Sequence, residues 1–232
     1  MDGAIHLDAV RAGAGWLLAA VTREITLFAL FGLLVGGLDD LLVDLLWLAR
    51  GGWRRLTVYR RHARMTMATL PPAEAPGAIA IFVGAWAEGA VIGAMVRTAL
   101  TNIRHEDYRL YVGTYPNDPE TEQAVDAIGD ARVRRVGGIL PGPTTKAECL
   151  NRVWQAMLAD EAAEGRRFKT IILHDAEDLI HPLELTLYDR MIERFDLVQI
   201  PVLPLIARES LWARIISATY ADEFSEPNFA LA

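Results

Sequence analysis

The sequence contains a single cysteine, Cys149, among its 232 residues. An intramolecular disulfide is therefore excluded, and a reducing compartment fits the chain. Basic residues are not in excess either. The formal net charge is −7, which leaves no global positive field and no reason to expect a nucleic-acid partner. The basic side chains are unevenly placed, because six of them crowd into one short segment: Arg50, Arg54, Arg55, Arg60, Arg61 and Arg64.

The apolar N-terminal region lacks a charge-free run of the roughly 20 residues that a membrane-spanning helix needs. Residues 25–38, ITLFALFGLLVGGL, carry no charge, and apolar character resumes after Asp39 and Asp40. On a helix, Asp40 and Asp44 would share one face while leucines cover the rest. The segment is either a long buried helix of a soluble protein or a helix that spans or lies along a membrane.

We expect membrane association for this segment, because the arginines that follow it satisfy the positive-inside tendency. That tendency would place the remainder of the chain in the cytoplasm. A signal peptide is a poor fit, since the apolar run starts late, acidic residues precede it and no clear small-residue cleavage site follows.

Composition divides the chain into three regions. Residues 1–50 form the hydrophobic, membrane-associated segment, and residues 51–76 form a basic juxtamembrane segment that ends in a proline-containing linker, LPPAEAP. In residues 77–232, short aliphatic runs alternate with amphipathic stretches. Strands are expected at 78–83, 108–113, 132–136, 170–173 and 197–203, and helices at 89–103, 119–128 (with Asp118 as N-cap), 144–158, 182–195 and 210–220.

This alternation predicts an α/β domain with a mostly parallel sheet and helices on both faces. In such sheets, ligands bind beyond the carboxyl ends of the strands. Two loops fall there: residues 84–88, GAWAE, and residues 174–178, HDAED.

The second loop combines an aliphatic strand with a cluster of carboxylates. Asp175 and Glu177 are two residues apart and should project to the same side. They would repel each other unless a cation lay between them, and hard divalent cations accept carboxylates together with substrate phosphates. The alternative is a solvated acidic loop in which Asp178 stabilises the start of the next helix.

A third interpretation makes His174 and Asp175 the ligand pair of an HD-type metal phosphohydrolase. That class carries its pair on helices and needs further histidine and aspartate ligands. Here the pair ends a strand, and the other histidines upstream are poorly placed: His6, His62 and His105. His181 is most simply a residue at a helix start.

Four segments together resemble family 2 glycosyltransferases, in the order and spacing of that family. Residues 78–100 resemble its first strand, loop and helix, and residues 112–125, VGTYPNDPETEQAV, its second strand and D-G-S-x-D-x-T turn. Residues 141–157 resemble its K-x-x-x-L-N segment, and residues 172–185, ILHDAEDLIHPLEL, its D-x-D turn. The residues of these segments are most similar to those of an inner-membrane branch of the family that is connected with bacteriophage adsorption. The resemblance covers residue 25 to the end of the sequence.

The resemblance implies a GT-A-like, Rossmann-like fold behind an N-terminal membrane-associated helix, and a nucleotide-sugar donor bound with Mg²⁺ or Mn²⁺. It implies a membrane-anchored hexosyltransferase of surface polysaccharide or envelope assembly in the bacterial inner membrane, with its domain facing the cytoplasm. Partners would be the donor, the membrane and other envelope-complex proteins. Matching to the family motifs gives as metal ligands Asp175, Glu177 and Asp178, and as donor-binding residues Glu88, Thr114, Asp118, Lys146, Asn151 and Asp175.

Three of the residues in these segments have simpler alternatives. Lys146 either adds positive charge near the diphosphate or is a solvated helix start. Trp86 either stacks on a base or packs against the sheet, and we favour packing. Cys149 is expected to be a core residue of its helix.

The sequence also departs from the family. Gly113 and Thr114 stand where the family offers an aspartate to the base, so uridine recognition does not follow, and the D-x-D turn has become D-x-E. The later E-D pair that activates the acceptor and the Q-x-x-R-W segment are absent after Tyr220. We therefore expect either the donor-binding half of a longer protein or a truncated copy, with donor or metal binding but weak or no transfer and no visible catalytic base. The alternatives are a non-enzymatic scaffold of an envelope export or phage-adsorption complex, and a soluble nucleotide-binding domain.

Overall fold

The computed structural model describes residues 2–206 and 210–231, and these form two compact units. The first unit draws on residues 1–64 and 200–232 and contains the helices α1 (Asp2–Leu56) and α6 (Leu211–Leu231), which contact each other. The second unit, residues 65–199, contains the sheet. We describe each unit by itself.

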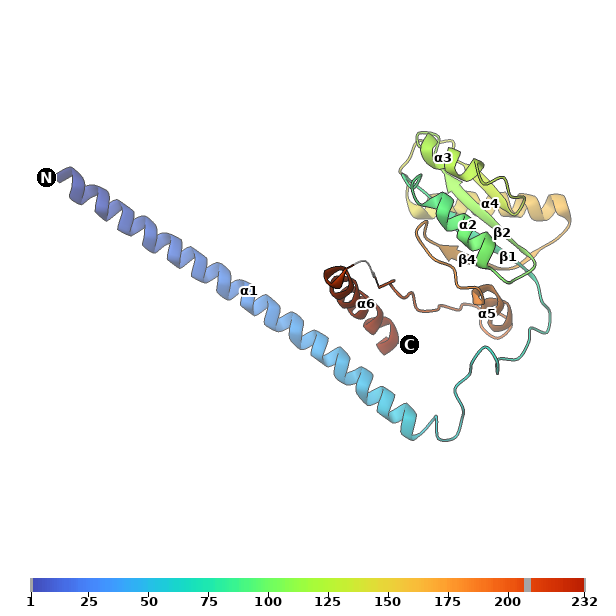
Figure 1. The fold of residues 1–232 in the computed structure, drawn as a ribbon, viewed down its shortest axis with the longest axis horizontal. Helices are drawn as coiled ribbons and strands as arrows, with labels where there is room; N and C mark the ends of the chain where they lie inside the picture. Colours follow the sequence, from blue (N-terminus) through green and yellow to red (C-terminus); the bar gives the residue numbers. More distant parts are fainter. Residues whose placement is uncertain (1, 207–209, 232) are drawn as a thin grey trace. The chain divides into compact units, whose positions relative to one another are not determined.

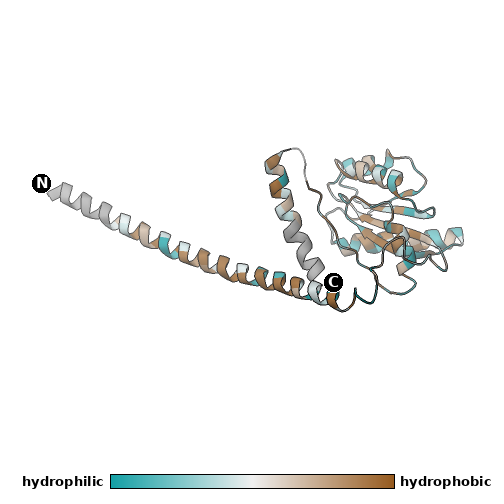
Figure 2. Ribbon diagram, turned by 60° about the horizontal axis from the view of Figure 1, so that its bottom comes forward, coloured by the Kyte–Doolittle hydropathy of each residue, from teal (hydrophilic) through white to brown (hydrophobic). Residues whose placement is uncertain are grey.

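Helix α1 is one continuous helix of 55 residues (Figure 1). A rise of 1.5 Å per residue makes it about 80 Å long. Its part from Gly13 to Leu56 is long and apolar enough to cross a membrane, and none of its most apolar window is buried. Apolar residues follow one another along this part (Figure 2), and side chains such as Phe28 and Leu33 are 81% and 73% exposed. The described residues therefore do not cover α1 as a core would. Helix α1 continues past residue 50, where the sequence predicts a boundary between the hydrophobic and the basic region. The division of the chain into three regions stays a prediction.

The predicted parallel sheet is confirmed. Its strands are β1 (Ala78–Gly84), β2 (Tyr108–Thr114), β3 (Val133–Gly137) and β4 (Phe168–His174), in the order β3-β2-β1-β4 with every pair parallel. Val83 of the central strand lies beside Val112 of β2 and His174 of β4. The carboxyl ends of these three strands therefore meet at one edge of the sheet.

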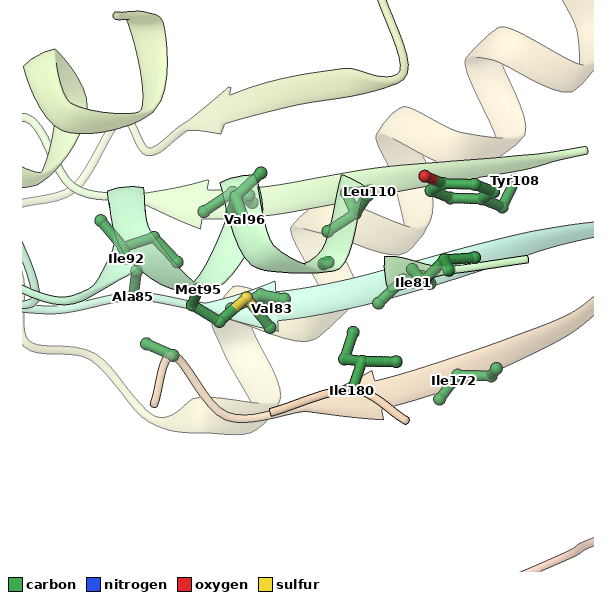
Figure 3. Close-up of a cluster of buried hydrophobic side chains, with 14 of the residues drawn as sticks. Ile81, Val83, Ala85, Ile92, Met95, Val96, Tyr108, Leu110, Ile172 and Ile180 are labelled. Atoms are coloured by element: carbon green, nitrogen blue, oxygen red, sulfur yellow. The ribbon is translucent and has the colours of Figure 1, made fainter. Parts of the chain in front are cut away.

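Helices pack on both faces of the sheet. They are α2 (Ile92–Asn102), α3 (Pro119–Asp126), α4 (Lys146–Glu164) and α5 (Glu184–Met191). Because side chains alternate along a strand, β1 serves two cores. Ile81 and Val83 pack with residues of α2 (Figure 3), whereas Phe82 packs with Val153 and Met157 of α4.

Several predicted elements differ in extent, among them the helix expected at 210–220, which extends to Leu231 as α6, and one strand does not form. The strand expected at 197–203 is wrong, since these residues form no strand. Pro201, inside this stretch, lacks the backbone N–H that a sheet ladder requires, and Pro204 follows directly after it. Helix α5 is shorter than expected, and α4 extends to Glu164, where Gly165 ends it in a left-handed conformation with φ 66°.

Candidate functional site

A cleft of about 370 Å³ opens where the carboxyl ends of β1, β2 and β4 meet. Its walls come from the loops after these strands and from the start of α4. The lining residues are Gly84, Ala85, Trp86, Glu88, Tyr115, Pro143, Thr144, Lys146, Cys149, Asp175, Ala176 and Glu177. The fold thus brings together the residues predicted from two separate loops, and it places them where ligands bind in parallel sheets.

The carboxylate turn after β4 is anchored by its apolar residues. Ala176 and Ile180 are each 2% exposed and belong to the core between the sheet and α2, where Ile180 lies near Ile172 (Figure 3). Asp175 and Glu177, on either side of Ala176, are exposed. Both residues are exposed and line the cleft, and their role as metal ligands stays a prediction.

Asp178 is turned back onto this loop. Its Oδ2 accepts a hydrogen bond from the Asp175 backbone N–H at 2.9 Å and lies 3.0 Å from His174 Nδ1, while His174 Nε2 lies 2.8 Å from Glu184 Oε1. Burial alone would lower the pKa of His174, but the hydrogen bonds and charges of Glu184 and Asp178 outweigh it and raise the pKa. The histidine therefore links two carboxylates behind the turn.

This linkage bears on the predicted metal ligands. In the described part of the chain, no group of three or more His, Cys, Asp or Glu side chains is arranged to hold a metal ion. The contacts of Asp178 hold the turn, so its role as a ligand stays a prediction. Sequence reasoning considered His174 only as part of an HD pair and missed Glu184, and the one available signal was the position of the histidine directly before the turn.

Lys146 supplies positive charge to the cleft. It is the first residue of α4, whose N-cap Thr145 accepts a hydrogen bond from the Glu148 N–H at 3.2 Å. The Lys146 ammonium forms an ion pair with Asp175 Oδ1. Because Glu88, Asp175 and Glu177 also line the cleft, its charged side chains have a net formal charge of −2.

An aromatic pair forms another part of the wall. Trp86 and Tyr115 meet edge to face, with ring centroids 5.3 Å apart and an interplanar angle of 89°. Trp86 thus packs against Tyr115, directly after β2, and also lines the cleft, so stacking on a base stays open. Gly142 lies so close that a Cβ would stand 2.6 Å from the Trp86 ring, and Asn117 bonds both the N–H and the C=O of Gly142 at 2.7 and 2.9 Å. Sequence reasoning missed Tyr115, Asn117 and Gly142, because no local pattern joins segments so far apart.

Three predicted donor-binding residues do not line the cleft. The Thr114 side chain is fully buried and donates to Glu122 Oε1 at 3.2 Å, and Asn151 is exposed on α4. Asp118 is only 9% exposed. Direct contact of these residues with a donor stays a prediction.

Asp118 holds the loop after β1 in place. Its Oδ2 accepts from the Ala87 N–H at 2.7 Å, and its Oδ1 caps α3 by accepting from the Thr121 N–H, which confirms the predicted N-cap. Ala87 has a φ of 56°, which is costly for a residue other than glycine. Thr121 Oγ1 also accepts from the Glu88 N–H at 3.0 Å. These bonds fix the segment that carries Trp86 and Glu88.

Asp118→Ala is expected to lower the free energy of unfolding by about 1–2 kcal/mol at neutral pH, the usual cost of losing an N-cap. Burial tends to raise the pKa of Asp118, but the hydrogen bonds from Thr121 and Ala87 outweigh it, so the folded-state pKa lies below its usual value. The contribution of the carboxylate is therefore present above its unfolded pKa and is lost as pH falls through the folded pKa.

Urea titrations of the full chain in detergent at pH 7 and at pH 3 measure this effect. The difference from the unaltered chain should shrink at the lower pH, and Asp118→Asn, which keeps a capping oxygen, should lose less. An equal loss at both pH values would contradict the assignment to the charged carboxylate.

Residues 76–232 match the sequence profile described as glycosyltransferase like family 2. Two curated relatives are similar to this chain: bacteriophage adsorption protein B of Escherichia coli strain K12 and bacteriophage N4 adsorption protein B of Escherichia coli O157:H7. Each is 44% identical over 216 residues. The alignment covers 92% of this chain but 28% of each relative, so the chain spans less than a third of their length. Both relatives are named as phage adsorption proteins, which confirms the branch of the family that the sequence resembles.

Proposed function

The chain belongs to the family glycosyltransferase like family 2, and from that premise we propose that its cleft binds a nucleotide-sugar donor together with a divalent cation. The observation that carries the proposal is the convergence of Asp175, Glu177 and Lys146 at the carboxyl edge of a parallel sheet. This edge is where such sheets bind ligands.

Charge supports the participation of a metal ion. The charged side chains that line the cleft have a net formal charge of −2. They would therefore repel the negatively charged diphosphate of a donor. Mg²⁺ and Mn²⁺ accept hard oxygen ligands and commonly bind through one or two carboxylates plus substrate phosphates. Asp175 and Glu177 fit that chemistry, because both are exposed on the solvent side of a turn anchored in the core. A metal bound there would neutralise the leaving diphosphate.

The remaining groups of the cleft have distinct proposed roles. The N-terminal end of α4, with Lys146, favours the negative charge of the diphosphate. Trp86 and Tyr115 offer aromatic surface to the nucleoside, and Glu88 stands next to them. Asp178 and His174 position the turn. We assign the base that deprotonates the acceptor to no residue in the described ranges 2–206 and 210–231.

The proposal extends to the setting of the reaction. We propose that α1 anchors the domain in the bacterial inner membrane and that the arginines at its end keep the domain on the cytoplasmic side. Transfer of a hexosyl group would then serve surface polysaccharide or envelope assembly, with other envelope proteins as partners.

A second candidate is a non-enzymatic scaffold in an envelope complex. Two observations favour it: Asp175 is paired with Lys146, and the described residues hold no preformed group of three or more metal ligands. This candidate predicts no nucleotide binding, so the same measurement separates the two.

Calorimetry on the full chain in detergent tests the proposal, with UDP-sugars and GDP-sugars titrated in the presence and absence of Mn²⁺. We expect saturable binding of one nucleotide class that requires Mn²⁺. Absence of binding by every nucleotide in the presence of Mn²⁺ would favour the scaffold instead.

A further inference from the structure

The ion pair between Lys146 and Asp175 lies inside the proposed donor site. Lys146 is the one basic side chain among the lining residues, and its ammonium contacts Asp175 Oδ1. For Glu177 the structure records no hydrogen bond or ion pair within residues 2–206 and 210–231. One of the two proposed metal-binding carboxylates therefore already holds a cation supplied by the protein.

The ion pair between Lys146 and Asp175 can be broken at little cost to the stability of the fold. The side chains of Lys146 and Asp175 are 60% and 56% exposed, and exposed ion pairs contribute little to stability. Lys169 provides a contrast within the same unit. Its side chain is only 17% exposed, and its Nζ lies 2.7–2.8 Å from the Ala75 carbonyl oxygen, from two oxygens of Asp189 and from Glu193 Oε1. Lys169 thus holds together several segments of its unit, whereas the one partner recorded for Lys146 among residues 2–206 and 210–231 is the exposed Asp175.

We infer that Lys146 is an exchangeable counter-ion of the donor site, and this rests on the function proposed above. The ammonium occupies Asp175 while the carboxylates hold no divalent cation. When a metal and its diphosphate arrive, the ammonium leaves Asp175 and binds the diphosphate oxygens. Its four-carbon stem and three N–H donors permit the change of partner. Its place at the start of α4 keeps it where the helix dipole favours an anion.

If this exchange occurs, removal of the Lys146 ammonium should change the affinity for the metal ion and the affinity for the nucleotide in opposite directions. Without the ammonium, a metal ion alone meets no competitor at Asp175 and should bind more tightly, by up to about fivefold for an exposed pair. A nucleoside diphosphate in saturating metal loses a charged hydrogen-bond donor and should bind more weakly, by about tenfold. A lysine that merely supported the fold would not separate the two affinities in this way.

The experiment uses the full chain in detergent and three variants: Lys146→Met, Lys146→Arg and Arg167→Met. Arg167 is exposed and directly precedes β4, at the end of that strand away from the turn, so its variant removes the same charge outside the cleft. Free Mn²⁺ measured by electron paramagnetic resonance gives the affinity for the metal alone. Calorimetry with UDP and GDP in saturating Mn²⁺ gives the nucleotide affinity.

The expected result is tighter Mn²⁺ and weaker nucleotide binding for Lys146→Met, with Lys146→Arg and Arg167→Met close to the unaltered chain. If Lys146→Met weakens both affinities, strengthens both or changes neither, the exchange is overturned, while nucleotide binding by the unaltered chain leaves the proposed function standing. If the unaltered chain binds neither nucleotide, the donor site itself is refuted and the exchange falls with it.

Discussion

Asp175→Ala should weaken Mn²⁺-dependent nucleotide-sugar binding by at least about 100-fold. Substitution of a residue that hydrogen-bonds a metal ligand typically lowers affinity by about 10–100-fold. Substitution of the ligand itself should lower it further. The ion pair of Asp175 with Lys146 adds nothing to this loss, because the ammonium leaves Asp175 when the metal and the diphosphate bind. The measurement is calorimetry on the full chain in detergent with the nucleotide sugar that the unaltered chain binds, titrated in saturating Mn²⁺.

A matched control is Asp196→Ala. Asp196 is exposed in the segment after α5 and does not line the cleft, so its substitution removes the same charge without touching the site. The fold should tolerate both variants, since the Asp175 side chain is 56% exposed and the turn is held by Ala176 and Ile180 in the core. Unchanged binding in Asp175→Ala, with melting temperatures equal to that of the control, would remove the donor site from this turn.

Local patterns were enough to predict most of the elements that position the site. The aliphatic run of β1, the N-cap at Asp118 and the spacing of Asp175 and Glu177 each depend on residues close together in the sequence. Strand alternation then predicted a parallel sheet, and the sheet determines which edge binds ligands. The carboxylate turn could therefore be placed in the cleft before its surroundings were known.

The contacts that hold the site together could not be predicted in this way. His174 bonds Glu184 across ten positions, and Asn117 bonds Gly142 across 25. Polar residues at such separations have many possible partners, and only the folded backbone selects among them. The strand expected at 197–203 is wrong for the opposite reason, since the local apolar pattern was outweighed by the missing N–H of Pro201.

The departure from the family at position 113 has a structural cause. Gly113 is buried near the end of β2, where α4 crosses closely over the sheet. A Cβ at this position would stand 2.5 Å from Cys149 Sγ and 3.0 Å from a Val153 methyl group. Any larger side chain requires the side chains of Cys149 and Val153, or α4 itself, to shift. The glycine therefore accompanies the close packing of Cys149, which the sequence predicted as a core residue and which is 2% exposed.

Gly113→Asp, which restores the aspartate of the family motif, should consequently lower the free energy of unfolding by about 3–5 kcal/mol and should not improve nucleotide binding. Overpacking of a core costs about 1–3 kcal/mol, and a carboxylate buried without partners adds to that cost. Urea titration of the full chain in detergent, followed by near-ultraviolet circular dichroism, measures the loss of packing in the sheet unit.

A double-mutant cycle attributes the loss to the contact with Cys149. Gly113→Ala should cost about 1–3 kcal/mol by overpacking alone, because the added methyl group meets the sulfur. Cys149→Ala removes that sulfur, so in its presence the cost of Gly113→Ala should fall by at least about 0.5 kcal/mol, a coupling typical of residues in direct contact. Strictly additive losses would show that position 113 is constrained by something other than Cys149. In that case the missing aspartate would have to be explained by ligand recognition rather than by the packing of α4.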